Sequence, residues 1–583
     1  MDDVTLRYFD AEMRYLQEAG EEFARAHPEQ AAMLLPDRVG ARDPTVERLF
    51  EGFAFLMGRL RAKLDDDLPE LTEGLVSLLW PHYLRAIPSL SVVAFTPDWQ
   101  VMKDPLTLPR GFEVMSRPVG EKGTRCRYTT TREVNLLPLS LEQAALTNDT
   151  DGRAMIRLRF ACSGLADWSK TDVSRLPLYL NADPALACAL HEALTLNVAD
   201  IWLRLPREAD RRPLNGYFAA QGFGEDDGLW PQGGSSFAGW QLLQEYFTFR
   251  EKFMSVCLRG LETVELPEVL SGFELDVVLN KHWEHPFSFQ ARHLQLNSVP
   301  VINLFPLESD PLSISALQTD YQLCPMRIQD GHTEIYSVDT VLSGSGHRYV
   351  PFSSFRHKGG MMRHAAPEYY YHTRVRRGAS GLHNTWLILG GEGFDTLSIP
   401  DEHLSLSLTA TNGQLPRRAL ENSVLDTVVK GTEVALSVRN LCAPTQPCYP
   451  PDRDRFHWRV LSHLGSGFLS MMDNAEVLRG TLALYDWTGE EMNRRRLEAI
   501  IDVRHSETER FHQGYLLRGV LIEVTLDSTG FTGRGDICLF GEMLSRFFAL
   551  YTDIHLFNRL VFILQPTGER LEWEEKHSRR IPG

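Results

Sequence analysis

The stretch Ser91-Val92-Val93-Ala94-Phe95 marks the point where the pattern of the chain changes from helical to β-rich. Its valines and phenylalanine are residues that favour strands. Before it, apolar residues recur every three or four positions, as on one face of a helix. After it, short strand-like runs are separated by Gly, Pro, Asn and Asp turns, as in antiparallel sheet. The sequence therefore predicts a multi-domain α+β protein that begins with helices.

The helical part carries two apolar stripes. The first stripe consists of Leu6, Phe9, Met13 and Leu16. A helix of about sixteen residues is marginal alone in water, so this stripe either folds back on its own domain or joins a bundle with partner chains. The second stripe, over residues 46–64, is wider and includes Phe50, Phe53 and Met57. Wide stripes usually face an interior, so we expect the second one in a core.

At 583 residues the chain exceeds one hydrophobic core, and its pattern divides it into four expected regions. These are an N-terminal helical region for assembly (1–90), a β-rich domain with helical insertions (91–310), a β-sandwich-like domain (311–455) and a C-terminal α+β domain (456–583). In the last region, alternating apolar residues predict a strand over 519–526, and a strong helical pattern covers 538–551.

Residues 343–380 are dense in Gly, Ser, His and Arg, and we expect them to form a long exposed loop. The loop also has the aromatic and arginine content of binding hot spots. Its candidate partner-contact residues are Phe352, Phe355, Arg356, Arg363, Tyr369 and Tyr370. A poorly ordered loop without a binding role is the alternative.

Two further candidates, Phe547 and Tyr551, lie on the helix predicted near the C-terminal end. This helix is apolar over most of its circumference. Such helices are buried, either in a domain core or in an obligate interface. We expect the domain core, with the obligate interface as the alternative.

Composition narrows the classes of function. Acidic residues outnumber basic ones, 77 to 60, for a net charge of -17, which disfavours binding to nucleic acid. The eight cysteines form no C-x-x-C pair, as expected in a reducing compartment. The start, Met1-Asp2-Asp3, has no apolar segment of a signal peptide, and no run approaches the roughly eighteen apolar residues of a membrane span. We expect a cytoplasmic protein that meets a membrane only through partners.

Catalytic and metal-binding motifs are missing from the sequence. It contains no G-x-S-x-G elbow, no H-E-x-x-H and no Walker A loop. His282, His285 and His293 lie near one another, but no cysteine or carboxylate pattern completes a zinc ligand set. We therefore expect no metal, no cofactor and no enzymatic activity.

A set of short strings spread over the whole chain resembles the TssF (VasA/ImpG) family of type VI secretion baseplate subunits. The N-terminal strings are an aromatic-acidic helix at 6–16 and Trp80-Pro81-His82-Tyr83-Leu84. The others lie at 43–49, 63–71, 108–111, 300–305, 411–416, 457–464 and 546–551. Each string is weak alone, but together they occur in the family's order.

The resemblance implies a structural part of a contractile injection machine. Two copies of a TssF protein would join one TssG, and the wedge would also carry TssE. TssK would link it to the inner-membrane complex, and six wedges would surround the spike hub and seed the sheath. The family offers no catalytic residues. A phage-tail baseplate protein is the nearest alternative, and a secreted β-domain effector enzyme is the alternative from another class.

Overall fold

The computed structural model describes most of residues 81–583 and, before them, Phe9, Met13, Arg48, residues 51–57 and Val76. Its longer gaps fall at 232–237, 284–288, 353–368, 392–401, 420–424, 452–458, 463–468 and 578–583. Contacts divide the chain into two compact units, one of residues 1–84 with 451–465 and one of residues 85–450 with 466–583. The four domain ranges stay a prediction, and strand pairing in the second unit crosses one of their boundaries.

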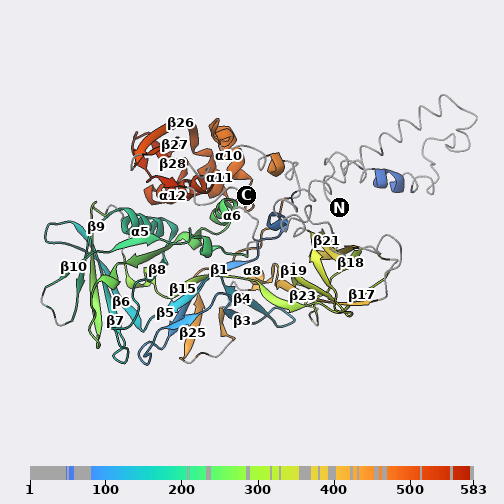
Figure 1. The fold of residues 1–583 in the computed structure, drawn as a ribbon, viewed down its shortest axis with the longest axis horizontal. Helices are drawn as coiled ribbons and strands as arrows, with labels where there is room; N and C mark the ends of the chain where they lie inside the picture. The colour runs from blue at the N-terminus through green and yellow to red at the C-terminus, as the bar shows by residue number, and fades with distance from the viewer. Residues whose placement is uncertain are drawn as a thin grey trace, which may run out of the picture. The chain divides into compact units, whose positions relative to one another are not determined.

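A six-stranded antiparallel sheet, counted over the described residues, lies at the centre of the second unit (Figure 1). In sheet order its strands are β24 (Leu425–Val428), β3 (Glu113–Val119), β4 (Thr124–Thr130), β15 (Ser298–Ile302), β1 (Leu90–Pro97) and β25 (Leu436–Asn440). The predicted strand at 91–95 is confirmed within β1. The end strands β24 and β25 touch, and Asn440 Oδ1 accepts a hydrogen bond from Leu425 N–H (3.3 Å). The sheet thus curls around a core that includes Val93, Tyr128 and Val299.

Two smaller sheets and a first helix lie in the stretch between β4 and β15. The first sheet has the order β10 (Arg212–Leu214), β9 (Val198–Arg204), β13 (Gly272–Leu279), β7 (Ala154–Cys162) and β6 (Leu139–Asn148). The second has the order β11 (Tyr217–Ala220), β12 (Ser255–Arg259), β8 (Leu176–Leu180) and β14 (Leu294–Gln295). Helix α5 (Pro184–Leu196) begins with proline at its first turn, where the missing N–H costs nothing. This confirms the helical insertion predicted there.

A larger sheet, eight-stranded over the described residues, follows β15. Its order is β16 (Phe305–Glu308), β23 (Glu402–Thr411), β19 (Glu334–Ser343), β20 (Arg348–Pro351), β21 (Tyr369–Arg377), β22 (His383–Gly391) and β18 (Asp320–Gln322), with β17 (Leu312–Ile314) beside β23. The prediction of one loop over 343–380 was therefore wrong at both ends, where β20 and β21 lie. The Gly344–Gly346 region is only the turn between β19 and β20, and a tyrosine-rich run forms β21.

The C-terminal part folds as a sheet with a long helix against it. The sheet order is β26 (Ile500–His512), β27 (Tyr515–Asp527), β28 (Leu556–Gln565) and β29 (Arg570–Glu572), with β30 (Lys576–His577) beside β28. Strands β27 and β28 are parallel, so helix α12 (Arg534–Tyr551) makes the crossover between them. This confirms the predicted strand at 519–526 and the predicted helix at 538–551, which begins four residues earlier.

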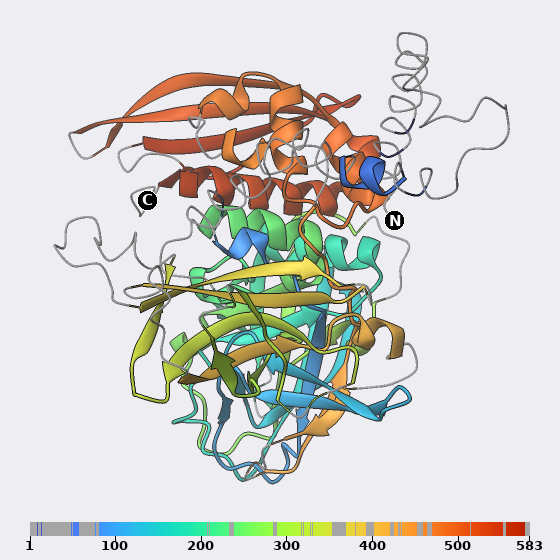
Figure 2. The same cartoon turned by 90° about the vertical axis from the view of Figure 1, so that its right-hand side faces the viewer.

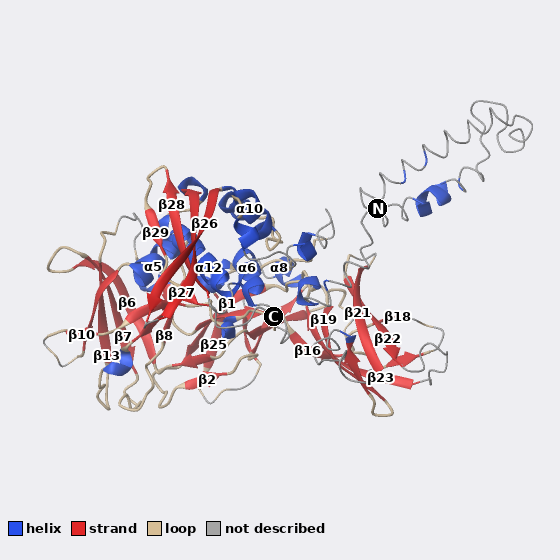
Figure 3. Cartoon of the chain, turned by 45° about the horizontal axis from the view of Figure 1, so that its top comes forward, coloured by secondary structure: helices blue, strands red, loops and turns tan. Residues whose placement is uncertain are grey.

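Helix α12 lies between two layers of the second unit. One side packs on β28, and the other packs on α5 and α6 (Ala238–Thr248), as Figure 2 shows. Shorter helices of this unit include α8 (Leu415–Ala419), α10 (Ala475–Ala483) and α11 (Glu491–Glu498), and its short 3-10 turns include η3 (Arg250–Phe253) and η8 (Leu469–Met472). A small pair, β2 (Leu106–Leu108) and β5 (Val134–Leu136), is separate from the larger sheets. Figure 3 shows strands as the dominant structure of this unit.

Candidate partner-binding surfaces

Strands β20 and β21 bring predicted contact residues together. The strands run parallel, with Val350 opposite Tyr370. The ring of Phe352, just after β20, lies 5.5 Å from the ring of Tyr370, and Phe352 is 39% exposed. His372, two positions along β21, lies 6.5 Å from Phe352. Because alternate residues of a strand share a face, Tyr370 and His372 form one aromatic surface with Phe352.

Tyr369 belongs to the opposite face of β21. Its ring lies 5.3 Å from that of Tyr349, and it packs against the core of the eight-stranded sheet together with its neighbour Tyr371. The Tyr371 hydroxyl donates a hydrogen bond to the carbonyl of Val338 (3.0 Å), which fixes this face inward. Of the predicted loop residues, Phe352 and Tyr370 therefore share an accessible face. Tyr369 lies on the other face of β21, which packs on the core. Phe355, Arg356 and Arg363 lie outside the described residues.

A glycine on the neighbouring strand sets the position of Tyr370. Gly390 of β22 lies directly opposite Tyr370. A Cβ atom at residue 390 would come within 2.4 Å of the Tyr370 ring, so only glycine lets the ring lie across β22. On the same strand pair, Arg376 packs over Trp386 (5.0 Å to the ring centroid) and pairs with Asp320 (2.9 Å). The β21–β22 surface thus combines aromatic and arginine side chains, as binding surfaces often do.

Phe547 lies in the core around α12. It is 0% exposed, and its ring lies 5.1 Å from that of Trp240 on α6. Trp240 in turn stacks on Tyr485 (5.2 Å). A partner could reach Phe547 only if this core opened, so the geometry favours the core interpretation over an interface. Tyr551 ends α12, and its side chain lies outside the described residues.

Substitution of Phe547 tests this core position. We expect Phe547→Ala to lower the free energy of unfolding by about 3–5 kcal/mol, because it leaves a cavity between α6 and α12. Urea denaturation followed by tryptophan fluorescence would measure the loss. Tyr217→Ala, at a side chain that is 63% exposed, should change the same quantity by no more than about 0.5 kcal/mol. Equal effects of the two variants would contradict the core position.

The described N-terminal helix exposes apolar side chains. Residues 51–57 are helical, and Phe53 and Leu56 are 52% and 65% exposed. The expectation that this stripe faces a core is therefore wrong for Phe53. Phe9 and Met13 of the first stripe are helical and half-buried, while Leu6 and Leu16 lie outside the described residues. Phe53 and Leu56 are thus two large apolar side chains exposed three residues apart on this helix.

Sequence reasoning missed a buried charge junction at the start of α12. The Asp536 carboxylate, 0% exposed, accepts hydrogen bonds from Arg250 of η3 and from Arg496 Nε of α11 (3.1 Å). Thr532 donates to the same carboxylate through its N–H (3.1 Å) and its hydroxyl (2.8 Å). Burial alone would raise the pKa of Asp536, but Arg250, Arg496 and Thr532 outweigh it and lower that pKa below its ordinary value. The three charged residues are 40 to 286 positions apart, so no local pattern predicts them.

A second buried pair lies beside this junction. Lys252 of η3 contacts Glu245 of α6, and both side chains are 3% exposed or less. Glu245 Oε1 also accepts hydrogen bonds from the N–H of Leu229 (2.7 Å) and the amide of Gln241 (2.6 Å). Breaking such a buried pair is costly, because one charge stays buried without its partner. These contacts tie the 238–253 segment together, while Arg250 ties it to the C-terminal part.

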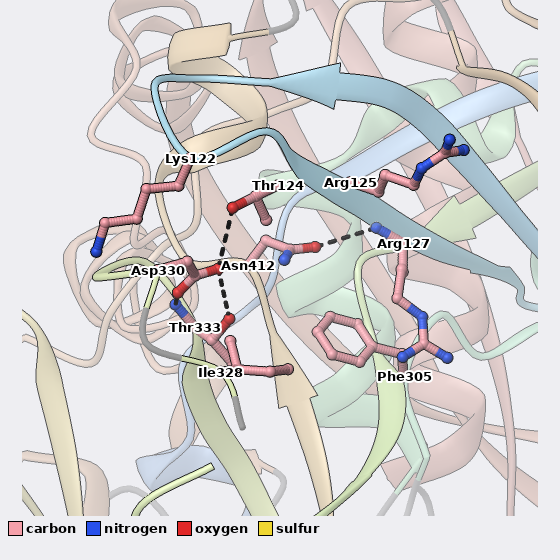
Figure 4. Close-up of a pocket in the computed structure, with 9 residues that line it drawn as sticks. All are labelled: Lys122, Thr124, Arg125, Arg127, Phe305, Ile328, Asp330, Thr333 and Asn412. Carbon is pink, nitrogen blue, oxygen red and sulfur yellow. Dashed lines mark hydrogen bonds between the residues drawn. The ribbon is translucent and has the colours of Figure 1, made fainter. Parts of the chain in front are cut away.

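One pocket of about 370 Å³ opens beside the β3–β4 turn (Figure 4). Its lining residues are Lys122, Thr124, Arg125, Arg127, Phe305, Ile328, Asp330, Thr333 and Asn412. The guanidinium of Arg127 lies 4.6 Å from the Phe305 ring centroid, and Asn412 Oδ1 accepts from Arg127 N–H (3.0 Å). The Asp330 carboxylate accepts hydrogen bonds from Thr124 (3.4 Å) and Thr333 (3.0 Å). The hydrogen bond between Thr124 and Asp330 thus joins the start of β4 to the loop before β19.

Neither a metal site nor a membrane-spanning helix is found in the described part of the chain. Within it, no group of three His, Cys, Asp or Glu side chains is placed to hold a metal ion. No helix among the same residues is both long and apolar enough to cross a membrane.

Comparison with known proteins identifies the family. The family model described as "Type VI secretion system, TssF" matches residues 1–580. The chain belongs to the TssF family. It is 28% identical over 615 residues to the type VI secretion system component TssF1 of Pseudomonas aeruginosa, covering 99% of each protein. This confirms the resemblance found in the sequence.

Two solved structures are similar to this TssF chain. One, from the TssK-TssF-TssG baseplate subcomplex of the type VI secretion system, has a TM-score of 0.83 and 57% identity, and the match covers 92% of this chain and 100% of that one. The other, from the baseplate complex of the type VI secretion system, has a TM-score of 0.73 and 54% identity, with 99% and 100% covered. The predicted multi-domain α+β fold is confirmed.

Proposed function

We propose that this TssF chain is a structural subunit of the type VI secretion baseplate and not an enzyme. In this proposal two copies join one TssG, and the resulting wedge binds TssK. TssE, the spike hub and the sheath attach to the assembled baseplate. The chain acts on the cytoplasmic side and reaches the inner-membrane complex only through these partners. The solved relative from the TssK-TssF-TssG subcomplex supports TssG and TssK as partners, and the one from the baseplate complex supports the place in the baseplate.

The exposed apolar side chains on residues 51–57 carry this proposal. Phe53 and Leu56 present their larger part to solvent on a helix whose Ala54 is fully buried. Burial of one such side chain contributes about 1.5–3 kcal/mol. A helical partner could cover both side chains at once, as in a bundle of helices from several chains. An assembly subunit gains from such a surface, whereas a protein that acts alone would be driven to bury it.

Co-expression with TssG tests the proposed stoichiometry. The complex would be purified by size exclusion and its mass determined by light scattering. We expect one peak with the mass of two copies of this chain and one TssG. A stable monomer that elutes separately from TssG would contradict the proposal.

Charged residues on the first apolar stripe should prevent assembly. We expect the double variant Phe9→Asp, Met13→Asp to lose TssG on copurification, because two aspartates cannot enter an apolar helix interface. Circular dichroism should show that the β-rich remainder stays folded. Val269→Asp, which changes a 69% exposed side chain in another part of the chain, is the matched control and should retain TssG in full yield. Full recovery of TssG with the double variant would exclude this helix from the contact.

A further inference from the structure

Strand β26 is a long strand at the edge of its sheet. It pairs along its length with β27, and over the described residues no strand pairs with its other side. Residues 504–510 are exposed except for the half-buried Thr508. Helix α10 and η8 contact β26, and the carbonyl of Met472 lies 3.3 Å from His505 Nδ1. An edge of this kind is a template for another strand.

The charges on this edge are mixed in sign and exposed. They are Asp502, Arg504, Glu507, Glu509 and Arg510. Charges on an edge strand usually discourage pairing with other chains. Like charges placed directly opposite each other destabilise a strand pair, and opposite charges stabilise it. The order of the charges therefore determines which pairings this edge permits.

Pairing between two copies of β26 can be evaluated register by register. In an antiparallel pair, two opposed residues both point their N–H and C=O groups toward the partner strand or both point them away. Because these directions alternate along a strand, two copies of the same strand can only pair with the two-fold axis at a residue and not between two residues. With the axis at residue 504, 507, 509 or 510, a charged side chain lies opposite the same side chain of the second copy. With the axis at 508, Glu507 of one copy lies opposite Glu509 of the other. An axis at 503 opposes Asp502 and Arg504 but pairs only residues 500–506 of each copy, and an axis at 505 opposes no two charged side chains. An axis at 506 places Glu507 opposite His505 and Asp502 opposite Arg510, and it opposes no like charges.

We propose that two copies of this chain pair through β26, antiparallel about Ser506, so that one sheet continues across both copies. The presence of two copies in one assembly rests on the proposed function. Within one copy, Asp502 contacts Arg504 (2.9 Å) and Arg510 contacts Glu575 (2.5 Å). Three of these side chains are 43–79% exposed, and Glu575 is 22% exposed. Such pairs contribute little, so the charged groups are able to exchange partners across the new interface.

A cysteine at the axis tests the register directly. In the proposed pair the two Ser506 Cα atoms lie about 4.5–5.5 Å apart, a separation that a disulfide can bridge. Two cysteines at position 504 would lie about 13 Å apart, four residues at about 3.3 Å each, which is too far. Both variants would carry Cys324→Ser, because Cys324 is exposed. The full chain, alone and with TssG, would be oxidised mildly and run on a non-reducing gel.

We expect a disulfide-linked dimer with Ser506→Cys and none with Arg504→Cys. Arg510→Asp, added to Ser506→Cys, should reduce the dimer at least tenfold, because aspartate would then face Asp502 in both halves of the interface. Addition of Asp502→Arg as well should restore it. Thermal melting would establish that each variant is folded. Equal crosslinking at 504 and 506, a crosslink from 506 to TssG, or no rescue by the double charge exchange would overturn the proposal.

The experiment separates this inference from the proposed function. If the chain forms the 2:1 complex with TssG but Ser506→Cys gives no dimer, the β26 pairing is wrong and the proposed function stands. If no 2:1 complex forms but the isolated chain crosslinks at 506, the edge pairing stands and the proposed stoichiometry is wrong. If neither occurs, both are wrong.

Discussion

Asp536→Ala is expected to lower the free energy of unfolding by about 3–5 kcal/mol, because it leaves two buried guanidinium groups without their shared carboxylate. Arg250 and Arg496 are 16% and 5% exposed, so water cannot replace the lost partner. Since Asp536 lies in the first turn of α12, hydrogen exchange should accelerate first in this helix. Urea denaturation and hydrogen–deuterium exchange would measure the two effects. Loss of less than about 1 kcal/mol would show that the junction does not hold α12 in place.

An exposed ion pair provides the control for this prediction. Asp426 pairs with Arg117 (2.5 Å), whose side chain is 79% exposed. Asp426→Ala should cost less than about 1 kcal/mol, because water solvates the remaining arginine. A difference between the two variants would then measure burial of the charges and not the loss of an aspartate.

The Asp536 junction also predicts how stability responds to acid. Its carboxyl has a lowered pKa in the folded chain, so the folded state binds the proton less readily than the unfolded state, whose aspartates titrate near about 3.9. The junction therefore contributes fully above that pH and is lost as the pH falls through the lowered pKa. We expect this contribution to be constant between about pH 5 and 8. A melting series against pH should show a smaller acid-dependent loss in Asp536→Asn than in the unchanged chain.

The double variant Phe53→Asp, Leu56→Asp is expected to abolish the complex with TssG. The two side chains together offer about 3–6 kcal/mol of apolar burial to a partner. Their loss corresponds to at least a hundredfold weaker binding, at about 1.4 kcal/mol for each tenfold change. Because both are exposed in the free chain, the substitutions should leave its melting temperature nearly unchanged. Copurification with tagged TssG, followed by titration calorimetry, would measure the effect.

A polar position on the same helix serves as the matched control. Glu51 is exposed and helical, and Glu51→Gln removes charge without adding or removing an apolar contact. This variant should bind TssG within about threefold of the unchanged chain, the effect of a modest surface charge. If the double aspartate variant also binds within this range, the exposed stripe is not the contact with TssG.

Local patterns predicted individual elements where one face is buried. The alternation of Val520, Ile522, Val524 and Leu526 fixed β27, because all four side chains face the core. The run at 538–551 gave α12 for the same reason. The prediction of a loop over 343–380 failed because it rested on composition, which does not reveal strand pairing. The polar, tyrosine-rich segment of β21 forms a strand because it pairs with β22 along its length. A local sequence pattern does not indicate which segments, distant in the sequence, pair as strands.

For the candidate surfaces as well, local patterns predicted single elements but not their surroundings. Periodicity indicated the apolar stripe at 46–64, but whether Phe53 faces a core depends on what the rest of the chain packs against it. Phe352 and Tyr370 were chosen for their type, and their proximity follows from the short parallel contact of β20 with β21. The Asp536 junction joins residues from three separate segments, and the two-sided exposure of β26 depends on where its sheet ends. Both features required the assembled fold.

The position of β1 has a consequence for synthesis of the chain. This almost wholly buried strand lies between β15 and β25, whose partner residues follow it by roughly two hundred and more than three hundred positions. A ribosome therefore releases β1 long before either neighbour exists, and the central sheet cannot close until residue 440 has emerged. Such distant pairings slow folding and leave apolar strands exposed in the meantime. The nascent chain consequently exposes an apolar segment that chaperones can bind for most of its translation. In a product truncated before β25, β1 would stay exposed, and we expect such a product to be degraded.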